Sequence, residues 1–525
     1  MTHWRVFTLF LLLFGTVASN TDIYSETNYG KNFLVFWPEN IAHYYPMVPD
    51  NKIQVIALHN ETKVTIKSFN DEQSKEQMKA GESYSFKISG EMEVKRKDIS
   101  NKTYQITSNL DIVVQVISVK EHSMQIVLVI PNDKFGSKFF IPPVVSRITD
   151  VINEVTERNP FRLLCVSDQK TTVTVKGSTT RKVTLQSNQV AQIWLDSSDS
   201  VVESDKPIGI YLSHPCLVQK ECNCSLLYTM LPPVKDQNLN FFIPPVLVKN
   251  AAETFILKAD GVQTQPEPFD DTSPQVESKG TAFLQLPGLL LPLIAEQDGA
   301  ACYVVNSIQG LMNTAVIVVH KDKKTGVHIG SSPIKASDWQ DLKGTDYVSA
   351  EVEIIIEKNV IWHADATMAV YLMSDLNGFH MGTPAPIISK IPDFRGCVIE
   401  PEIIHVGDVA NGWRESLQYC REQNMDLICF SSEKHRLKVN RFISENHSGL
   451  KDLWIGMRRS SLTGAWYWVS DCPLVDTSWA EGEPGQVQDG HCVMMEKDQE
   501  FTWRDEACCK AAQPVCNSPV LLFPI

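Results

Sequence analysis

The sequence has 525 residues, which is enough for roughly three or four domains of ordinary size. Hydrophobic residues make up 43% of it and charged residues 21%, the composition of a globular protein. The net charge of −14 argues against nucleic acid or an anionic membrane surface as the main partner, and solubility alone is a sufficient reason for that charge.

The first residues, MTHWRVFTLFLLLFGTVASN, predict a secretory signal peptide. Arg5 supplies the positive charge, an apolar run follows over residues 6–14, and small residues precede an expected cleavage after Ser19. The run is too short for a membrane anchor, because a spanning helix needs about 20 apolar residues. We therefore expect residues 1–19 to be removed and the mature protein to be extracellular, with no membrane span.

Thirteen cysteines, all after the signal peptide, fit an oxidising compartment. Because the number is odd, at least one thiol is free or pairs between chains, so a disulfide-linked oligomer is one expected state. Sequons of a secreted protein are expected to be exposed and glycosylated. The four sequon asparagines are Asn60, Asn101, Asn223 and Asn446.

Residues 30–378 are predicted to be mainly β. Runs such as KVTIKSF and TTVTVKG are rich in β-branched residues and are separated by Gly, Asn, Asp and Ser, and long helical periodicity is absent. This pattern favours repeated antiparallel β-sandwich-like units.

The same region repeats itself. KFFIPPV at 138–144 recurs as NFFIPPV at 240–246, an offset of 102 residues from 138 to 240. A second element recurs as SNLDIVVQVIS, SDKPIGIYLS and ADATMAVYLMS. We interpret these repeats as scaffold, with Phe-Phe-Ile in the core and Pro-Pro at a strand edge or turn. The three predicted β units are 30–137, 138–239 and 240–378.

The motifs FLVFWPEN, TTVTVKG with SDKPIGIYLSHPC, and CSLLYTMLPPV resemble the N-terminal domain of the IgGFc-binding protein family, over most of residues 30–378. The resemblance implies a secreted, mucus-associated β module without enzymatic activity. It does not imply that this chain binds immunoglobulin, because the family name comes from a large multidomain protein.

This resemblance also implies a disulfide between Cys216 and Cys224. Those two thiols with His214 and Cys222 can alternatively be drawn as a zinc site, but thiols this close in an oxidising compartment more often form disulfides. A further bridge between Cys165 and Cys302 would leave Cys222 over.

The C-terminal part differs in composition. PAPIISKIP, within residues 379–396, predicts a linker. GWRESLQYCREQNMD and SSEKHRLKVNRFISENH then predict two helices, the second capped by Ser431 or Ser432, followed by the Trp-rich strands DLWIGMRR and GAWYWVS. The residues expected near the inward faces of the helices are Trp413, Leu417, Tyr419, Cys420, Leu437 and Phe442.

This order resembles a C-type lectin-like domain, with WIGM at 454–457 and GAWYWVSD in the positions of the family's core strands. The resemblance implies an α+β domain over residues 397–517, followed by a tail at 518–525. It also implies two framework disulfides, whereas Cys472 and Cys509 are candidates for a third and Cys397 and Cys429 stay unassigned. The framework pairs are Cys420–Cys516 and Cys492–Cys508.

In this family the sugar site takes calcium ligands from Glu-Pro-Asn, a later acid and Trp-Asn-Asp, and a cis-proline directs the first set. The loop WAEGEPGQVQDGHCVMM keeps Glu483 but has Gly485 in place of the Asn. Asp489 lies one residue from the position of the later acid. In TWRD, Arg504 replaces the Asn before the retained Asp505.

Two interpretations of the loop follow. In the favoured one Glu483 and Asp505 pair with Arg504, and calcium and simple sugars bind weakly or not at all. The alternative is a remodelled calcium or sugar site that uses Glu481 and Asp489 as well. No cofactor is therefore firmly expected, and calcium is doubted. The loop tryptophans are expected in the core, as is usual for the family.

No catalytic motif of the G-x-S-x-G, H-E-x-x-H or phosphate-loop type is found, so we expect no enzyme. The leading hypothesis is a secreted recognition protein whose lectin-like domain binds glycans, glycoproteins or other protein ligands. The alternative is a structural or adhesive component of mucus or matrix that acts through its β units.

Overall fold

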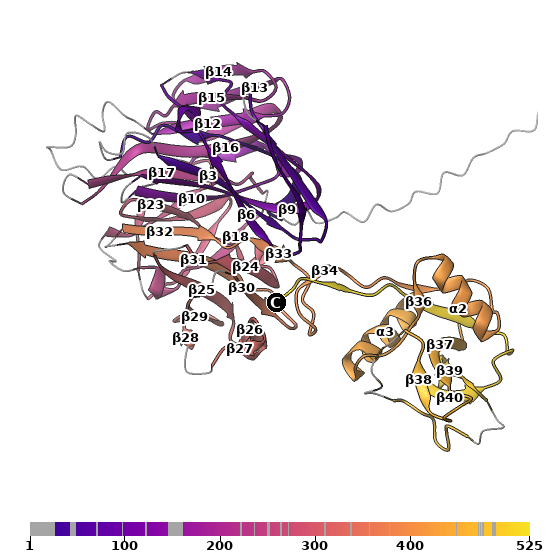
Figure 1. Cartoon of the computed structure of the whole chain (residues 1–525). Coiled ribbons are helices and arrows are strands. Elements are labelled where there is room, and N and C mark those ends of the chain that lie inside the picture. The colour runs from indigo at the N-terminus through magenta and orange to yellow at the C-terminus, as the bar shows by residue number, and fades with distance from the viewer. Residues whose placement is uncertain are drawn as a thin grey trace, which may run out of the picture. The chain divides into compact units, whose positions relative to one another are not determined.

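A computed structural model gives the fold of the chain (Figure 1). It describes residues 27–42, 49–69, 72–96, 98–120, 123–144, 161–220, 223–235, 237–248, 253–262, 265–270, 272–308, 311–335, 339–355, 358–376, 379–447, 449–470, 472, 474, 477–485 and 490–525. The signal peptide predicted at residues 1–19 lies outside these residues. The chain divides into two compact units, a β region that ends at Pro392 and a C-terminal unit over Asp393–Pro524.

In the β region, the first seven-stranded sheet is organised by one long strand, β9. The first half of β9 pairs with β1 and β4, and the second half pairs with β3 and β10, so β9 belongs to both layers of a sandwich. The sheet has the order β5-β4-β9-β3-β6. Its strands are β1 (Tyr29–Val35), β3 (Asp50–Ala57), β4 (Thr62–Lys67), β5 (Glu72–Met78), β6 (Ser83–Ile88), β9 (Tyr104–Lys120) and β10 (Ser123–Val129). The short strands β2 (Trp37–Pro38) and β7 (Glu93–Val94) pair in parallel.

The next sheet repeats this plan around β16. The first residues of β16 pair with β11 and β13, and its later residues pair with β12 and β17. The strands are β8 (Ile99–Ser100), β11 (Gly136–Phe140), β12 (Arg162–Ser167), β13 (Thr171–Lys176), β14 (Thr180–Leu185), β15 (Gln189–Trp194), β16 (Val201–Lys220) and β17 (Asn223–Leu231). The recurring sequence element therefore forms the same kind of long strand, followed by the same kind of hairpin partner, in both places.

The remaining β region has two parts. Two small sheets come first, made of β18 (Leu239–Phe242) with β21 (Gln275–Ser278), and of β20 (Glu267–Pro268), β19 (Phe255–Ala259), β22 (Thr281–Leu286) and β23 (Leu289–Pro292). Two five-stranded sheets follow. One contains β27 (Ser332–Pro333), β26 (Val327–Ile329), β30 (Lys358–His363), β24 (Cys302–Asn306) and β33 (Ile387–Ser389). The other contains β28 (Trp339–Asp341), β29 (Tyr347–Glu353), β25 (Met312–His320), β31 (Ala369–Leu376) and β32 (Phe379–Pro384).

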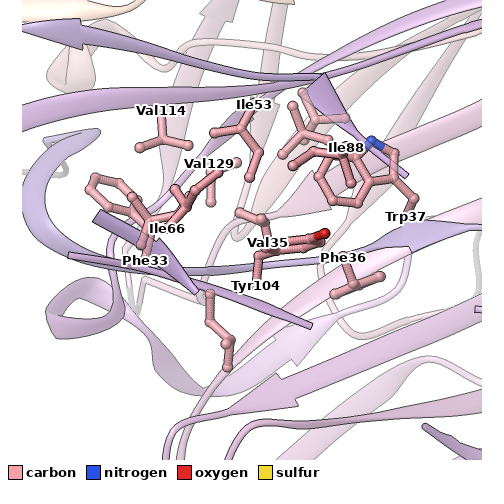
Figure 2. Packing of buried hydrophobic residues seen from close by; sticks show 14 of the residues in the cluster. Phe33, Val35, Phe36, Trp37, Ile53, Ile66, Ile88, Tyr104, Val114 and Val129 are labelled. Atoms are coloured by element: carbon pink, nitrogen blue, oxygen red, sulfur yellow. The ribbon is translucent and has the colours of Figure 1, made fainter. Parts of the chain in front are cut away.

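Alternation along the strands builds the core. In β25, Ala315, Ile317 and Val319 pack between the two five-stranded sheets, whereas Val316 and Val318 pack against the small sheets. The core of the first unit is continuous with side chains of the next sheet, and aromatic residues fill it (Figure 2). Phe33, Phe36, Trp37 and Tyr104 are all essentially inaccessible to solvent.

Several boundaries differ from the prediction. The expected linker 379–396 carries β32 and β33, which pair with β31 and β24, so the β region extends to Pro392. Their backbone groups are satisfied in sheets, and the apolar run that indicated a linker is instead buried. The expected tail 518–525 also contains a strand, β42 (Leu521–Leu522), which pairs with β34 (Val398–Glu400).

The C-terminal unit is an α+β fold of the C-type lectin type. Its helices are α2 (Trp413–Glu422) and α3 (Glu433–Asn446), and the Ser432 hydroxyl accepts a bond from the His435 amide at the start of α3. The other strands are β35 (Ile404–Val406), β36 (Asp426–Leu427), β37 (Asp452–Arg459), β38 (Trp466–Trp468), β39 (Cys492–Glu496), β40 (Thr502–Glu506) and β41 (Gln513–Asn517). No described helix of either unit has the length and hydropathy to cross a membrane.

The inward face of α3 differs from the prediction. His435, Val439 and Ile443 are buried at a spacing of four residues, and Leu437 lies on the other side of the helix with 53% of its surface exposed. The prediction that Leu437 faces inward was wrong, because the buried face of α3 begins with the polar residue His435. His435 is accommodated there because its Nε2 lies 2.9 Å from both carboxylate oxygens of Glu402.

The structure forms the disulfides Cys216–Cys224, Cys420–Cys516 and Cys492–Cys508. Two other suggested pairs are wrong. Cys472 is bonded to Cys429, so Cys509 is a free, exposed thiol. Cys165 is free and buried on β12, whereas Cys302 is disulfide-bonded.

Candidate functional site

The loop before β39 folds into a turn around a cis peptide bond between Glu483 and Pro484. The Glu483 amide donates to the Ala480 carbonyl at 3.0 Å, and Gly482 between them has a φ of +84°, which favours glycine. The loop is also bound to β40. The Trp503 amide donates to the Ser478 carbonyl at 2.7 Å, and the Ala480 amide donates to the Trp503 carbonyl at 2.8 Å. These bonds hold Glu483 beside strand β40.

Aromatic side chains of the core pack against this loop. Trp503 is fully buried and stacks on Phe430 with ring centroids 5.5 Å apart. Trp468 and Trp479 meet the Trp503 ring edge-on at 5.6 and 5.9 Å. Trp503 and Trp468 belong to the core, and Trp479 is half-buried against it. The tryptophans of this loop therefore position the backbone, as expected, and are not presented as a platform for a sugar ring.

Glu483 and Asp505 form a pair of carboxylates held by backbone amides. The Gly485 amide donates to Glu483 Oε2 at 3.2 Å and to Asp505 Oδ1 at 3.0 Å, and the Asp505 amide donates to Glu483 Oε2 at 3.4 Å. The hydrogen bond and the like charge from Asp505 raise the pKa of Glu483. Among the described residues, no lysine, arginine or histidine pairs with either acid, and Asp505 Oδ2 is buried without a partner.

Arg504 faces away from this acidic pair. Its guanidinium lies 2.7 Å from Glu496, 3.4 Å from Asp452 and 3.8 Å from Glu506. The predicted pairing of Arg504 with Glu483 and Asp505 is therefore wrong. The reason is the alternation of a strand, in which neighbouring side chains of β40 point to opposite faces, and Trp503 and Asp505 occupy the buried face. The alternation of TWRDE was a signal that could have placed Arg504 and Asp505 on opposite faces of the strand.

The described residues do not fit a calcium ion of the type the fold family uses. Calcium takes six to eight oxygen ligands, whereas the described part of the loop brings together only the carboxylates of Glu483 and Asp505 and, at Gly485, an N–H donor directed at both of them. At Gly490 a Cβ atom would lie 2.4 Å from the Glu506 amide nitrogen, so close packing on β40 excludes a ligand side chain there. Glu481 is exposed, and Asp489 lies outside the described residues.

No group of three or more His, Cys, Asp or Glu side chains could hold an ion among the residues described. In the alternative zinc site, Cys216 and Cys224 are joined to each other, and Cys222 lies outside the described residues. His214 is buried, accepts a bond from the Cys216 amide at 3.2 Å and packs against Phe161.

Three of the four sequon asparagines are exposed. Asn60 and Asn101 lie in loops of the β region, and Asn446 is the last residue of α3. Asn223 begins β17, and its side chain is outside the described part of the chain. An exposed asparagine is a requirement for glycan attachment, so these three positions remain candidates.

Family models match both parts of the chain. The model described as IgGFc binding protein matches residues 19–195 and 177–283, which together span half of the sequence. The chain belongs to the IgGFc-binding protein family. The model described as Lectin C-type domain matches residues 409–518. The first match covers the β region up to residue 283, and the second covers most of the C-terminal unit.

Individual relatives match one part each. The IgGFc-binding protein of Homo sapiens is 24% identical over 363 residues, which covers 59% of this chain and 6% of that protein. C-type mannose receptor 2 of Homo sapiens is 25% identical over 105 residues, and the match spans 20% of this chain and 7% of the receptor. The chain therefore spans less than a tenth of the length of these two relatives. Human lithostathine matches at 24% identity and a TM-score of 0.22, over 22% of this chain and 83% of that one.

Proposed function

We propose that this chain is a secreted, non-enzymatic recognition protein whose lectin-like domain binds glycan or protein ligands without a complete calcium-dependent sugar site. The observation that carries the proposal is the arrangement around Glu483 and Asp505. Glu483 and Asp505 lie side by side, and the Gly485 amide donates a hydrogen bond to both acids directly. Ligand recognition by this surface would then rest on hydrogen bonds and shape and not on an ion.

A glycan array probed with the secreted protein, with and without EDTA, tests this function. We expect any bound glycan or glycoprotein to be retained in EDTA, and isothermal titration with millimolar calcium to give no binding heat. Glycan binding that EDTA abolishes and that Glu483→Ala also removes would contradict the proposal and restore a calcium-dependent sugar site.

A second function is favoured by the match of the IgGFc-binding family to the β region. In that case the chain would be a structural or adhesive component of mucus or matrix that makes its contacts through the β units, and the lectin-like fold would serve as a module only. Binding of the protein to purified mucin, retained by the β region alone and accompanied by an empty glycan array, would support this alternative.

The free thiols bear on the predicted disulfide-linked oligomer. Cys509 is exposed, whereas burial raises the pKa of Cys165 to about 12 and keeps that thiol protonated. If an intermolecular bridge forms through a described cysteine, it forms through Cys509. We expect a non-reducing gel of secreted Cys509→Ser to lack any dimer that the wild type shows, and a dimer that persists would exclude Cys509 as its site.

A further inference from the structure

A cavity of about 160 Å³ lies in the β region where the edges of four sheets meet. The strands around it are β10, β17, β23 and β32, and in the described chain each of them pairs with a single neighbour in its own sheet. Each is in contact with the next, in the ring β10, β17, β23, β32 and back to β10, and their labels lie close together in Figure 1. The second strands of the three repeated hairpins, together with β23, therefore border one space that is partly open to solvent.

The lining of this cavity is mainly apolar. Side chains of all four strands and their neighbours contribute to it, and many are buried. An apolar cavity of comparable volume, about 150 Å³, stays dry in water and takes up benzene or xenon. The volume and the lining therefore suit an apolar molecule near the size of one aromatic ring. The buried apolar lining includes Val127, Tyr228, Leu290, Leu293, Tyr303 and Ala385.

The uncharged polar residues Gln125 and Thr229 line the cavity together with Thr27, Asn28 and Thr383. Gln125 on β10 is 6% exposed and Thr229 on β17 is 7% exposed. Among the described residues, neither side chain has a hydrogen-bond partner. A buried polar group without a partner costs free energy, so a bound molecule with one hydrogen-bonding group would be preferred over a pure hydrocarbon.

Charge on the ligand is not favoured. The charged lining residues, Lys134 and Asp298, are paired with Asp133 and Lys235 respectively. With both charges matched by neighbours, an ionic ligand would lose its hydration without gaining an unpaired counter-charge.

We propose that this cavity binds a small, uncharged apolar molecule, about the size of one aromatic ring, that carries one hydroxyl group. The apolar body fills the space between the four strands, and the hydroxyl group both donates to and accepts from Gln125 and Thr229. This site is separate from the lectin-like domain and does not rest on the function proposed above.

Phenol and toluene test the proposed hydrogen bonds to Gln125 and Thr229. The two molecules have nearly the same shape, but phenol carries a hydroxyl group where toluene carries a methyl group. Calorimetric titration of the full secreted chain should give one site for phenol, with an affinity about tenfold higher than that for toluene. The variant Thr229→Val, which keeps the side-chain shape, should remove most of this preference and leave toluene binding unchanged. The proposed hydrogen bonds would be ruled out if the wild type bound phenol and toluene with equal affinity. They would also be ruled out if the preference for phenol persisted in both Thr229→Val and Gln125→Leu.

Substitutions that fill the cavity with a larger side chain test whether phenol binds there. Ile126 lines the cavity, whereas Met124, two residues earlier on the same strand and equally half-buried, does not. Ile126→Trp should lower phenol affinity about tenfold or more, and Met124→Trp should leave it unchanged. If Ile126→Trp is not secreted, Ala385→Leu fills the same space with a smaller change. Phenol binding that both filled variants retain, or a wild-type cavity that holds only water and gives no heat with either probe, would disprove the site.

Discussion

At the scale of single residues, the direction of side chains on β40 decides what the lectin-like loop can do. Arg504 and Asp505 are adjacent in sequence. The Arg504 guanidinium forms ion pairs with Asp452 and Glu496, whereas Asp505 lies beside Glu483 and donates its backbone amide to that carboxylate. Arg504, which was predicted to pair with Glu483 and Asp505, therefore lies on the opposite face of the strand. We propose that the number of oxygen ligands limits calcium binding, because Gly485 brings no side-chain oxygen to the two acids.

This distinction gives a prediction for two variants of the loop. Gly485→Asn adds a side-chain oxygen beside two carboxylates, so we expect calcium affinity to rise about tenfold or more above the wild type. Arg504→Asn changes the other face of β40 and should leave calcium affinity nearly unchanged. Isothermal titration with calcium measures both variants. A larger gain for Arg504→Asn than for Gly485→Asn would show that the guanidinium, and not the ligand number, controls the site.

A second residue, Glu93 in the β region, has a consequence for stability. Burial raises its pKa from the ordinary 4.5 to about 7, although the Asn40 amide donates to its carboxylate and Lys120 lies nearby. The folded protein therefore binds a proton that the unfolded chain releases, so stability is lost as pH rises from about 4.5 to about 7.

We predict that Glu93→Gln removes this part of the pH dependence. A neutral amide keeps an acceptor for Asn40 and carries no buried charge, so the variant should gain on the order of 1–3 kcal/mol over the wild type at pH 7.5 and little at pH 4.5. Denaturant unfolding at the two pH values measures the difference. Glu91→Gln, an exposed neighbour, is the control and should follow the wild type at both values.

At the scale of elements, the C-terminal unit depends on links between segments distant in sequence. Strand β41 pairs with β35 and β36 and lies parallel to β37, and the Cys420–Cys516 disulfide joins it to α2. The bridge closes a segment of 96 residues, which is a large restriction on the unfolded chain.

Removing this bridge should therefore destabilise the unit strongly. For the double variant Cys420→Ser with Cys516→Ser we predict a loss on the order of 4 kcal/mol, seen as a lower unfolding temperature and reduced secretion. Cys509→Ser is the matched control, because that thiol is exposed and free, and its effect should stay within about 0.5 kcal/mol. An equal loss in the control would mean that Cys509 has a structural role.

At the scale of the whole molecule, repeated hairpins build the β region. The recurring sequence elements lie in β9, β16 and β31, and each is followed by its antiparallel partner, β10, β17 or β32. In the described chain these three partners are sheet edges, and with a fourth edge, β23, they form the ring of strands that borders the partly open cavity. The repeats therefore act as a scaffold, and the cavity proposed to bind a small molecule lies between their edge strands.

For the intact molecule we predict secretion with removal of residues 1–19 and glycosylation at the exposed sequons. Mass spectrometry of the secreted product should find a new N-terminus after Ser19 and glycan on Asn60, Asn101 and Asn446. Each glycan should disappear in the corresponding Asn→Gln variant without loss of the others. An intact Met1, or unmodified asparagines at all three positions, would contradict the secretory route.

The sequence by itself determined the features that local patterns encode. Alternating β-branched runs predicted the β region, helical spacing with Ser431 or Ser432 as cap predicted α3, and the framework cysteines followed from the family resemblance. Tertiary structure decided the rest, because it depends on partners that are distant in sequence. Leu437 is exposed because Glu402 allows His435 to be buried instead, and Cys472 joins Cys429 because folding brings those two residues together. In the candidate site, the alternation of TWRDE separates Arg504 from Asp505, but only the pairing of β40 with its neighbours decides which acids each of them meets.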